Sequence, residues 1–392
     1  MRADVVNVLE LRSVRGIGGG PDKTILLGAE RADRTRVAIT VCYIRDARDD
    51  GFGIGEPASR SNVDYVEIVE RHSLDPGILA PLRRLVRDRG IDIVHAHDYK
   101  TDVLALILAR LERIVPLATV HGWSGHSRRE GLYYAMDKRL LRAFPLVIAV
   151  CTEWRAELLR HRVHADRVRV VLNSIDHSAY RRDRALEPAV RAELGLRLDD
   201  VVVGAVGRLE IEKRYDLLIE ACAALRARGL PVCLVIVGTG SLSNALGQLA
   251  CARLPADAYR PLGHRADVVR LHHAFDVFVQ SSANEGTSNA VLEAMALETP
   301  IVATDVGGTA ELAHDQVHGL LVPRLDVAAL TAAIERTIVD RAATERRVAA
   351  ARRRIETALS FDRRVATLDR IYIELARQFP RRIGRRVSEQ CA

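Results

Sequence analysis

Residues 276–308 have the sequence DVFVQSSANEGTSNAVLEAMALETPIVATDVGG, and the rest of the chain can be interpreted outward from this stretch. The pattern predicts a buried strand, a polar loop, a helix, a second buried strand and a Gly-Gly turn. Glu285 falls in the loop, and Glu293 lies about one turn into the helix. Helix N-termini attract phosphate, and carboxylates accept hydrogen bonds from sugar hydroxyls. The stretch alone therefore predicts a nucleotide-sugar site.

The composition is that of a globular protein with two domains. The chain has 392 residues, of which 48% are hydrophobic. Its net charge is +7, nearly all of the positive charge is arginine, and no aromatic–basic surface accompanies it. We therefore expect no nucleic-acid partner.

The cysteines and the apolar runs bear on the compartment. The six cysteines form no CxxC pair, which favours a reducing cytosol. No signal-peptide pattern precedes the first strand-like run, and no apolar run reaches the ~18–20 residues that a membrane span needs. We expect a cytoplasmic protein that is at most peripheral on the inner face of the cell membrane.

Predicted strands and helices alternate through both halves, which indicates α/β architecture with parallel sheets. We expect two Rossmann-like domains that face each other across a cleft, with ligands at the carboxyl ends of the strands. The charged segment 180–198 contains a proline and is interpreted as the linker region. The expected parts are an acceptor-side domain at 1–178, a donor domain at 179–361, a helix at 362–379 that packs back on the N-terminal domain, and a basic, disordered tail at 380–392.

Three segments of the second half match a known family. They are GRLEIEKRYDLLIEA at 207–221, VIVGTG at 235–240, and EGTSNAVLEAMALETPIVATDVGG at 285–308. The first half matches more loosely, through its Gly-rich first loop, DIVHAHD at 92–98 and TVHGW at 119–123. These segments resemble the retaining glycosyltransferases of family 4, also called group 1, which have the GT-B fold.

The resemblance implies an enzyme that moves a hexose from a nucleotide diphosphate sugar to a hydroxyl of a saccharide or lipid-linked acceptor. Such enzymes serve cell-envelope, exopolysaccharide or glycolipid synthesis. Uridine diphosphate sugars are the commoner donors in the family, and guanosine diphosphate mannose comes next. The donor is a co-substrate, and no separate cofactor is expected.

The expected donor residues come mainly from the second half. Arg208, at a predicted strand end, and Lys213, before the next helix, suit a diphosphate as a guanidinium fork and a point charge. The resemblance implies that Glu285 contacts donor-sugar hydroxyls and that Glu293 contacts the ribose. It also implies that the turn formed by Gly263, His264 and Arg265 meets the base, and that the segment after Glu285 holds phosphate and sugar through Gly286, Thr287, Ser288 and Asn289.

The first half contributes glycines and histidines. Gly18, Gly19 and Gly20 let the backbone approach another group closely, so this turn either faces the donor or is simply a tight turn. His121 either caps a strand or, as the resemblance implies, lies over the donor sugar and joins Arg208, Lys213 and Glu285 in catalysis. His97 or Asp98 is expected near the acceptor.

We expect no metal site. His95 and His97 share one face of a predicted strand, but no convergent carboxylate pair is evident beside them. The chain also lacks Asp-x-Asp, the paired carboxylates that usually hold a nucleotide diphosphate through a divalent metal. Metal-independent catalysis is therefore expected, with phosphate charge stabilised by basic side chains and backbone amides.

Two other functions fit parts of the pattern. One is a GT-B-fold sugar-nucleotide epimerase, which needs no acceptor, and the other is a catalytically silent nucleotide-sugar-binding protein. A further question is whether the predicted helix at 131–144 binds an anionic membrane or only presents a solvated basic face. Its flanking basic and apolar residues are Arg128, Arg129, Lys138, Arg139, Arg142, Leu132, Leu140 and Leu141.

Overall fold

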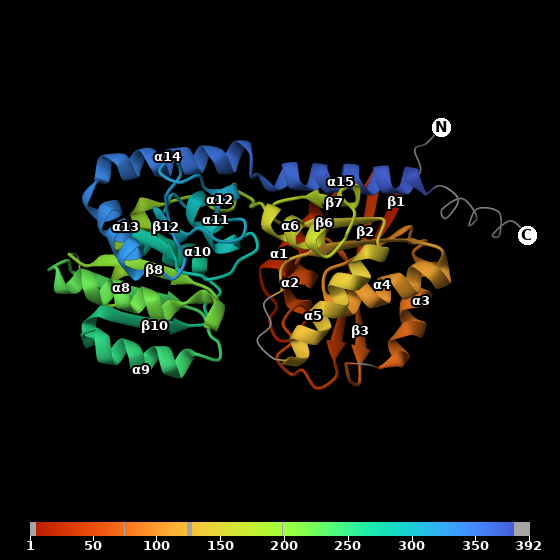
Figure 1. Cartoon of the computed structure of the whole chain (residues 1–392), viewed down its shortest axis with the longest axis horizontal. Helices are drawn as coiled ribbons and strands as arrows, with labels where there is room; N and C mark the ends of the chain where they lie inside the picture. Colours follow the sequence, from red (N-terminus) through yellow and green to blue (C-terminus); the bar gives the residue numbers. More distant parts are fainter. Residues whose placement is uncertain (1–4, 74, 124–127, 198, 380–392) are drawn as a thin grey trace, which may run out of the picture. The chain divides into compact units, whose positions relative to one another are not determined.

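The computed structural model describes residues 5–73, 75–123, 128–197 and 199–379. The predicted tail at 380–392 lies outside this range. The chain divides into two compact units (Figure 1). The first unit contains residues 1–172 and 362–392, and the second contains residues 173–361. The second unit thus begins a few residues before the position expected from the sequence.

The first unit is built on a seven-stranded parallel sheet with the order β3-β2-β1-β4-β5-β6-β7. The direction of strand succession reverses between β1 and β4, which makes this pair a topological switch point. The strands are β1 (Val6–Ser13), β2 (Val37–Asp46), β3 (Asp64–Glu70), β4 (Ile93–Ala96), β5 (Val115–Val120), β6 (Leu146–Ala149) and β7 (Val168–Val170).

Helices cover both faces of this sheet. They are α1 (Gly20–Arg31), α2 (Gly55–Arg60), α3 (Leu79–Asp88), α4 (Tyr99–Glu112), α5 (Arg128–Leu140), α6 (Thr152–Arg160) and α15 (Phe361–Gln378). Leu9 and Leu11 of β1 share a core with α3, α4 and α6, whereas Val6 and Val8 share a core with α15. Successive side chains of a strand point to opposite faces, so the sheet is buried on both sides.

The C-terminal helix α15 belongs to the first unit, although it follows the second unit in the chain. It is the long dark-blue helix in Figure 1. Ile371, Tyr372 and Leu375 are each at most 2% exposed and pack against β-strand residues of the first sheet. A segment from the end of the sequence therefore completes the core of the first unit.

The second unit has a six-stranded parallel sheet with the order β10-β9-β8-β11-β12-β13. Its switch point lies between β8 and β11. The strands are β8 (Val201–Val206), β9 (Val232–Val237), β10 (Tyr259–Gly263), β11 (Val277–Gln280), β12 (Ile301–Thr304) and β13 (Leu320–Val322). The predicted strand, loop, helix and strand between residues 276 and 308 are confirmed as β11, α11 and β12.

The helices of the second unit are α7 (Glu187–Glu193), α8 (Tyr215–Ala227), α9 (Ser243–Arg253), α10 (Val268–Leu271), α11 (Asn289–Ala296), α12 (Thr309–Leu312), α13 (Val327–Val339) and α14 (Arg341–Thr357). Helices α8, α9 and α13 pack on one face of the sheet, and α7 packs on the other. The linker interpretation of residues 180–198 is wrong, because Val190 and Leu194 anchor α7 in this core.

Helix α5 differs from the amphipathic membrane helix considered above. Leu141, predicted as part of its apolar face, is fully buried in the first core. Lys138 pairs with Glu157 at 2.6 Å and lies over the ring of Trp123. The side chains of Arg128, Arg129 and Leu132 are not among those that the structure describes. Among the helices that the structure describes, none is long and apolar enough to cross a membrane.

Candidate active site

The second unit carries its predicted catalytic residues beside the switch point of its sheet. Arg208 and Lys213 follow β8, and Glu285 follows β11, which is the neighbouring strand. Loops leave the carboxyl ends of such a strand pair in opposite directions, which opens room for a ligand. Strand order, and not proximity in sequence, therefore brings these two segments together.

Lys213 and Glu285 form the central contact. Nζ of Lys213 lies 2.5 Å from Oε1 of Glu285, and the two side chains are only 19% and 11% exposed. Ser282 donates to the same carboxylate oxygen at 2.7 Å, and Ser281 donates to the backbone oxygen of Lys213 at 2.8 Å. Arg208 is different: its side chain is 67% exposed and pairs with Glu212 at 3.0 Å. A fixed ammonium and an accessible guanidinium thus lie in the same loop.

The Gly-Gly turn after β12 supports the loop that carries Glu285. Gly308 donates its backbone N–H to the oxygen of Gly286 at 2.8 Å. Gly307 has φ +58°, and a Cβ there would lie 1.9 Å from the backbone oxygen of Glu285. Only glycine permits this approach, because a side chain would collide with the neighbouring backbone. The turn therefore has a structural reason that is separate from ligand binding.

Helix α11 begins beside this loop. Ser288 is its N-cap, and its side chain accepts from the backbone N–H of Val291. The backbone oxygen of Thr287 accepts from Asn173 at 3.0 Å. Oδ1 of Asn289 is buried without a hydrogen-bond partner among the described residues. A buried acceptor at a helix N-terminus suits a ligand that brings hydroxyl or N–H donors.

Glu293 is buried within α11. It is 7% exposed, and the hydroxyl of Tyr180 lies 3.5 Å from its Oε1. A carboxylate on an otherwise apolar helix costs free energy unless donors satisfy it. The hydroxyl of Tyr180 is one such donor, and the contact of Glu293 with ribose hydroxyls stays a prediction.

The predicted base-binding turn follows β10, two strands from β8 in the sheet. Gly263 has φ +64°, and its backbone oxygen accepts from Gly238 at 2.8 Å. Arg265 pairs with Asp267 at 2.6 Å and with Glu193 at 2.9 Å. His264 is exposed. The turn thus lies at the same carboxyl edge of the sheet as Arg208. The guanidinium of Arg265 is already held in ion pairs with Asp267 and Glu193.

The Gly-rich loop of the first unit is ordered by Asp22. One carboxylate oxygen accepts from the backbone of Gly19 at 2.6 Å, and the other accepts from Tyr43 at 2.8 Å and pairs with Arg12 at 2.6 Å. Gly18 has φ +74°, and a Cβ there would lie 2.5 Å from Ile54. The turn is therefore tight as well as positioned at a helix N-terminus, since Gly20 is the first residue of α1.

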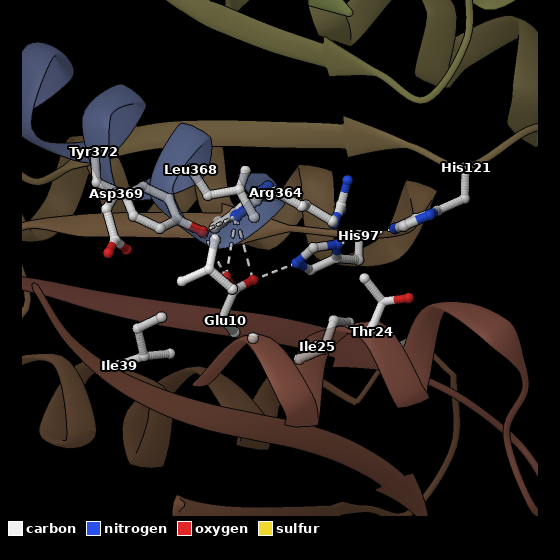
Figure 2. Close-up of a pocket in the computed structure, with 13 residues that line it drawn as sticks. Glu10, Thr24, Ile25, Ile39, His97, His121, Arg364, Leu368, Asp369 and Tyr372 are labelled. Atoms are coloured by element: carbon white, nitrogen blue, oxygen red, sulfur yellow. Dashed lines mark hydrogen bonds and ion pairs between the residues drawn. The ribbon is translucent and has the colours of Figure 1, made fainter. Parts of the chain in front are cut away.

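Three histidines meet at the switch point of the first sheet. His95 and His97 come from the end of β4, and His121 directly follows β5. Nδ1 of His97 lies 3.0 Å from Nε2 of His121, and Nε2 of His97 contacts Oε2 of Glu10. Figure 2 shows Glu10 at the centre of this group, with Tyr372 on one side and His97 on the other. The first unit therefore holds His121 within a polar network.

Further contacts complete the network around Glu10. The hydroxyl of Tyr372 donates to Oε1 of Glu10 at 2.6 Å. Nδ1 of His95 lies 2.9 Å from the same hydroxyl, and its Nε2 lies 2.7 Å from Oγ1 of Thr119. Glu10, His95, His97, His121 and Tyr372 also line a cavity of about 20 Å³, which is room for about one water.

The surroundings set the charge states in this network. Burial raises the pKa of Glu10, but the charges and hydrogen bonds of His95 and His97 outweigh it and hold that pKa well below its usual value. Burial, with His95 next in effect, lowers the pKa of His97 to about 4. Burial, with His97 and Arg12, also lowers the pKa of His121 well below its usual value. The lowered pKa values keep the carboxylate of Glu10 anionic and the rings of His97 and His121 neutral near pH 7.

One group of atoms in this network has the composition of a metal site. Atoms of Glu10, His95 and His97 all lie within 4.8 Å of one another. Zinc would hold such atoms about 2.0–2.2 Å from itself and would replace the protons between them. Here the carboxylate contacts Nε2 of His97 directly, as in a hydrogen bond. We interpret the cluster as a hydrogen-bond network, and metal independence stays a prediction.

Asp98 has a structural task. It is the N-cap of α4 and accepts from the backbone N–H groups of Lys100 and Thr101. Its second oxygen accepts from the backbone of Ser13 at 2.8 Å, which ties β1 to α4. Both carboxylate oxygens are thus engaged by the protein. His97 is 6% exposed and lies between Glu10 and His121.

Sequence reasoning missed Glu10, Asp22 and Tyr372. The sequence pattern could have pointed to Glu10. It is the one charged residue among the first six of β1, VNVLEL, and it lies on the same strand face as Val6 and Val8, where a buried charge is unusual. No such pattern singled out Tyr372, because the predicted return of the C-terminal helix does not indicate which of its residues meets β1.

Two family models match the chain. The model described as Glycosyltransferase Family 4 matches residues 19–179, and the model described as Glycosyl transferases group 1 matches residues 187–354. EpsD of Bacillus subtilis (strain 168), whose name assigns it to the glycosyltransferases, is 30% identical over 68% of this chain and 73% of its own length. The chain belongs to glycosyltransferase family 4.

Other members of the family show similar coverage. The D-inositol 3-phosphate glycosyltransferase of Salinispora arenicola (strain CNS-205) is 31% identical over 74% of this glycosyltransferase and 65% of its own length. Among solved structures, Anabaena Alr3699/HepE in complex with UDP and glucose superposes with a TM-score of 0.83 at 21% identity. That match covers 94% of this glycosyltransferase and all of the other chain, and it confirms the predicted GT-B fold.

Proposed function

We propose that this glycosyltransferase transfers a hexose from a nucleotide diphosphate sugar to a hydroxyl of a saccharide or lipid-linked acceptor, with retention of the anomeric configuration and without a metal. The observation that carries the proposal is the Lys213–Glu285 pair at the switch point of the second sheet. It sets a cation for a diphosphate beside an acceptor for sugar hydroxyls.

Each donor residue has a proposed role. Lys213 and Arg208 stabilise the charge that develops on the leaving diphosphate, and the N-terminal amides of α11 add to them. Glu285 accepts from hydroxyls of the transferred sugar, and Glu293 accepts from the ribose.

The remaining contacts involve two turns and one histidine. The turn Gly263–Arg265 contacts the base, the turn Gly18–Gly20 contacts the donor, and His121 contacts the transferred sugar. A phosphate oxygen of the leaving group takes the proton of the acceptor hydroxyl, which attacks from the same face.

Uridine diphosphate is the preferred nucleotide in this proposal. Anabaena Alr3699/HepE, whose fold this chain shares, was solved with UDP and with UDP-glucose. That likeness supports uridine donors here without choosing the sugar. Exopolysaccharide, glycolipid or cell-envelope synthesis is the proposed setting.

A thermal-shift panel of nucleotide sugars tests the donor, because a ligand that binds only the folded protein raises its melting temperature. A stabilising donor is then incubated with saccharide and polyprenyl-linked acceptors, and the product anomer is read by NMR. Retention of the anomeric configuration is expected, and an inverted product would overturn the retaining mechanism.

Incubation with the donor alone separates transfer from epimerisation, since an epimer formed without acceptor would support the epimerase. Equal rates with EDTA and with added Mg²⁺ are expected.

We also propose where the enzyme meets an anionic membrane. Tyr99, Val103, Ile107 and Leu111 repeat every four residues along α4 and are 38–46% exposed. The ring of Tyr133 on α5 stacks on Tyr99 at 5.4 Å, and Met136 of α5 is 49% exposed.

The charges beside this apolar stripe are cationic. Arg110 and Arg113, on either side of Leu111 in the chain, are exposed, and so is Arg139 of α5. Apolar and aromatic side chains bordered by arginine are typical of interfacial helices on anionic lipid. This surface differs from the basic face of α5 considered in the sequence, of which Leu141 is buried.

Vesicle sedimentation tests the membrane surface. Wild-type enzyme is expected to sediment with phosphatidylglycerol-containing vesicles, and the triple variant Val103→Ser, Ile107→Ser, Leu111→Ser to remain in the supernatant. The matched control is Val317→Ser with Leu325→Ser, two exposed apolar residues of the second unit. Equal sedimentation of wild type and triple variant would contradict the proposal.

A further inference from the structure

A continuous chain of hydrogen bonds connects the C-terminal helix to His121. It runs from the hydroxyl of Tyr372 to Glu10, from Glu10 to His97, and from His97 to His121. Figure 2 shows these side chains in this order, with α15 behind Tyr372. The transfer reaction proposed above uses only His121, so the other three side chains have no role in it yet.

The carboxylate of Glu10 gives the chain a direction. An ionised carboxylate only accepts hydrogen bonds, so Nε2 of His97 must carry the proton in the contact with Oε2. A neutral imidazole has one donor and one acceptor nitrogen. Nδ1 of His97 is therefore the acceptor, and Nε2 of His121, 3.0 Å away, must donate to it. Nδ1 of His121 then presents a lone pair.

This direction holds for neutral histidines, and the packing keeps them neutral. His97 is 6% exposed, so charging it would require burying a cation. Two cations already face these rings: Arg12 from β1 and Arg364 from α15 both lower the pKa of His121, as do His97 and His95, although burial has the largest effect. Glu10 is the anion that faces them.

Glu10 itself is held by groups from different elements. It is 6% exposed on β1, Tyr372 comes from α15, and His95 comes from β4, with its other nitrogen 2.7 Å from Thr119 of β5. A carboxylate with donors on both oxygens cannot rotate without losing them. The orientation that it imposes on His97 is therefore well determined by the fold.

We propose that Glu10 is a positioning residue that acts through His97 to hold His121 with its proton on Nε2, so that Nδ1 accepts a hydrogen bond from a hydroxyl of the transferred sugar. This inference rests on the proposed function, which assigns His121 to the donor sugar. The opposite tautomer would present an N–H in the same place and would lose the acceptor. Which nitrogen carries the proton depends on the hydrogen bond that the other nitrogen makes.

NMR of enzyme labelled with ¹⁵N-histidine tests the tautomer without any substrate. The resonances of His121 are assigned by their loss in His121→Gln. A protonated Nε2 and an unprotonated Nδ1 are expected in the resting enzyme. A proton on Nδ1 would overturn the inference, whatever reaction the enzyme catalyses.

Variants test whether Glu10 is responsible. Glu10→Ala is expected to mix the two tautomers of His121 and to lower kcat/KM for the sugar donor about 10- to 100-fold, by analogy with the loss of a group that orients a metal-bound histidine. Its affinity for UDP alone, which lacks the sugar, is expected to stay within about twofold of wild type. A pure Nε2–H tautomer in Glu10→Ala would contradict the role of Glu10.

Position 97 provides a second test that does not depend on how well Glu10→Ala folds. Gln can donate to Glu10 through its amide nitrogen and accept from His121 through its amide oxygen. His97→Gln should therefore keep the tautomer of His121 and most of the activity, whereas His97→Leu should lose both. Equal activity of these two variants would show that His97 only fills space.

Metal titration and the transfer assay show which proposal fails, if one does. If added Zn²⁺ shifts the resonances of His95 and His97 at stoichiometric concentration, the cluster is a metal site and the inference fails. If no nucleotide sugar supports transfer, the proposed function fails, and the NMR experiment still decides whether Glu10 sets the tautomer. If transfer occurs and the tautomer does not depend on Glu10, the inference alone fails.

Discussion

Nζ of Lys213 lies 2.5 Å from Oε1 of Glu285, although the two residues are 72 positions apart in the chain. The contact joins the loop after β8 to the loop after β11 at the switch point of the sheet. Before a donor binds, the two charges neutralise each other in a partly buried setting. A bound diphosphate sugar would offer phosphate to the ammonium group and hydroxyls to the carboxylate.

Replacing Lys213 tests its proposed role on the diphosphate. Lys213→Ala is expected to lower kcat by about 10²–10³-fold, as for loss of one group that stabilises developing charge. Steady-state kinetics with the donor identified by the panel measure the effect. The matched control is Arg228→Ala, which removes an exposed arginine paired with Glu335 and should leave kcat unchanged. Near wild-type turnover in Lys213→Ala would refute the proposed role.

The two glutamates should affect binding differently. Glu293→Gln is expected to weaken UDP and UDP-sugar binding alike, by about 10- to 100-fold, since a hydrogen bond to a charged group contributes ~1.5–3 kcal/mol. Glu285→Gln is expected to weaken only the nucleotide that carries a sugar. Calorimetric titration with UDP and with the UDP-sugar separates the two roles. Glu298→Gln serves as the control, because Glu298 is exposed and lies just after the end of α11. A uniform loss in Glu285→Gln would contradict its assignment to the sugar.

Gly307 is expected to be intolerant of any side chain. In Gly307→Ala the new Cβ would collide with the backbone of Glu285, in addition to the ~1–3 kcal/mol cost of a strained backbone at φ +58°. Both the free energy of unfolding and the transfer rate should therefore fall. Gly229→Ala isolates the backbone cost, because Gly229 has φ +88° with no atom within 4 Å of the position of its Cβ. Similar unfolding curves for the two variants, by urea titration, would rule out the predicted collision.

A buried pair of acids links α4 to α5 and predicts a dependence of stability on pH. Burial, then the charge and hydrogen bond of Asp137, raises the pKa of Asp102 well above its usual value. Burial also raises the pKa of Asp137, which accepts from Trp123 at 2.9 Å. In the unfolded chain both acids ionise near pH 4. Their contribution to stability is therefore complete below about pH 4 and is lost as pH rises through the folded-state pKa values.

The size of this effect is set by linkage. Each proton that the unfolded state releases while the folded state keeps it costs up to ~1.4 kcal/mol of stability per pH unit. Asp102→Asn, which keeps a donor for Asp137, should flatten the decline above pH 4 and raise the melting temperature at pH 8. Asp166→Asn, at a side chain that is 88% exposed, is the control. The pair would have no such role if Asp102→Asn and wild type lost stability in parallel.

Several site features could be predicted because they are local. The helix α11 and its flanking strands follow from apolar runs, a Ser N-cap and a Gly-Gly turn within about 30 residues. Residue types at strand ends then point to phosphate and sugar chemistry. The linker interpretation failed because the feature that decides it is not local. Residues 180–198 look polar in sequence, but the short helix α7 is stabilised by Val190 and Leu194, which pack into a core with β8 and β9.

Patterns in the sequence were enough to predict that the chain alternates strands and helices, that it resembles family 4 glycosyltransferases, and which residues at strand ends are candidates for contact with a nucleotide sugar. These properties are local, since periodicity, caps and turns depend on residues a few positions apart. The contact of Glu10 with Tyr372, 362 positions away, is visible only in the folded chain, and so are the contacts of Glu10 with His97 and of His97 with His121. Such contacts depend on strand order and on which residue of α15 lies against β1, neither of which is encoded in a local pattern.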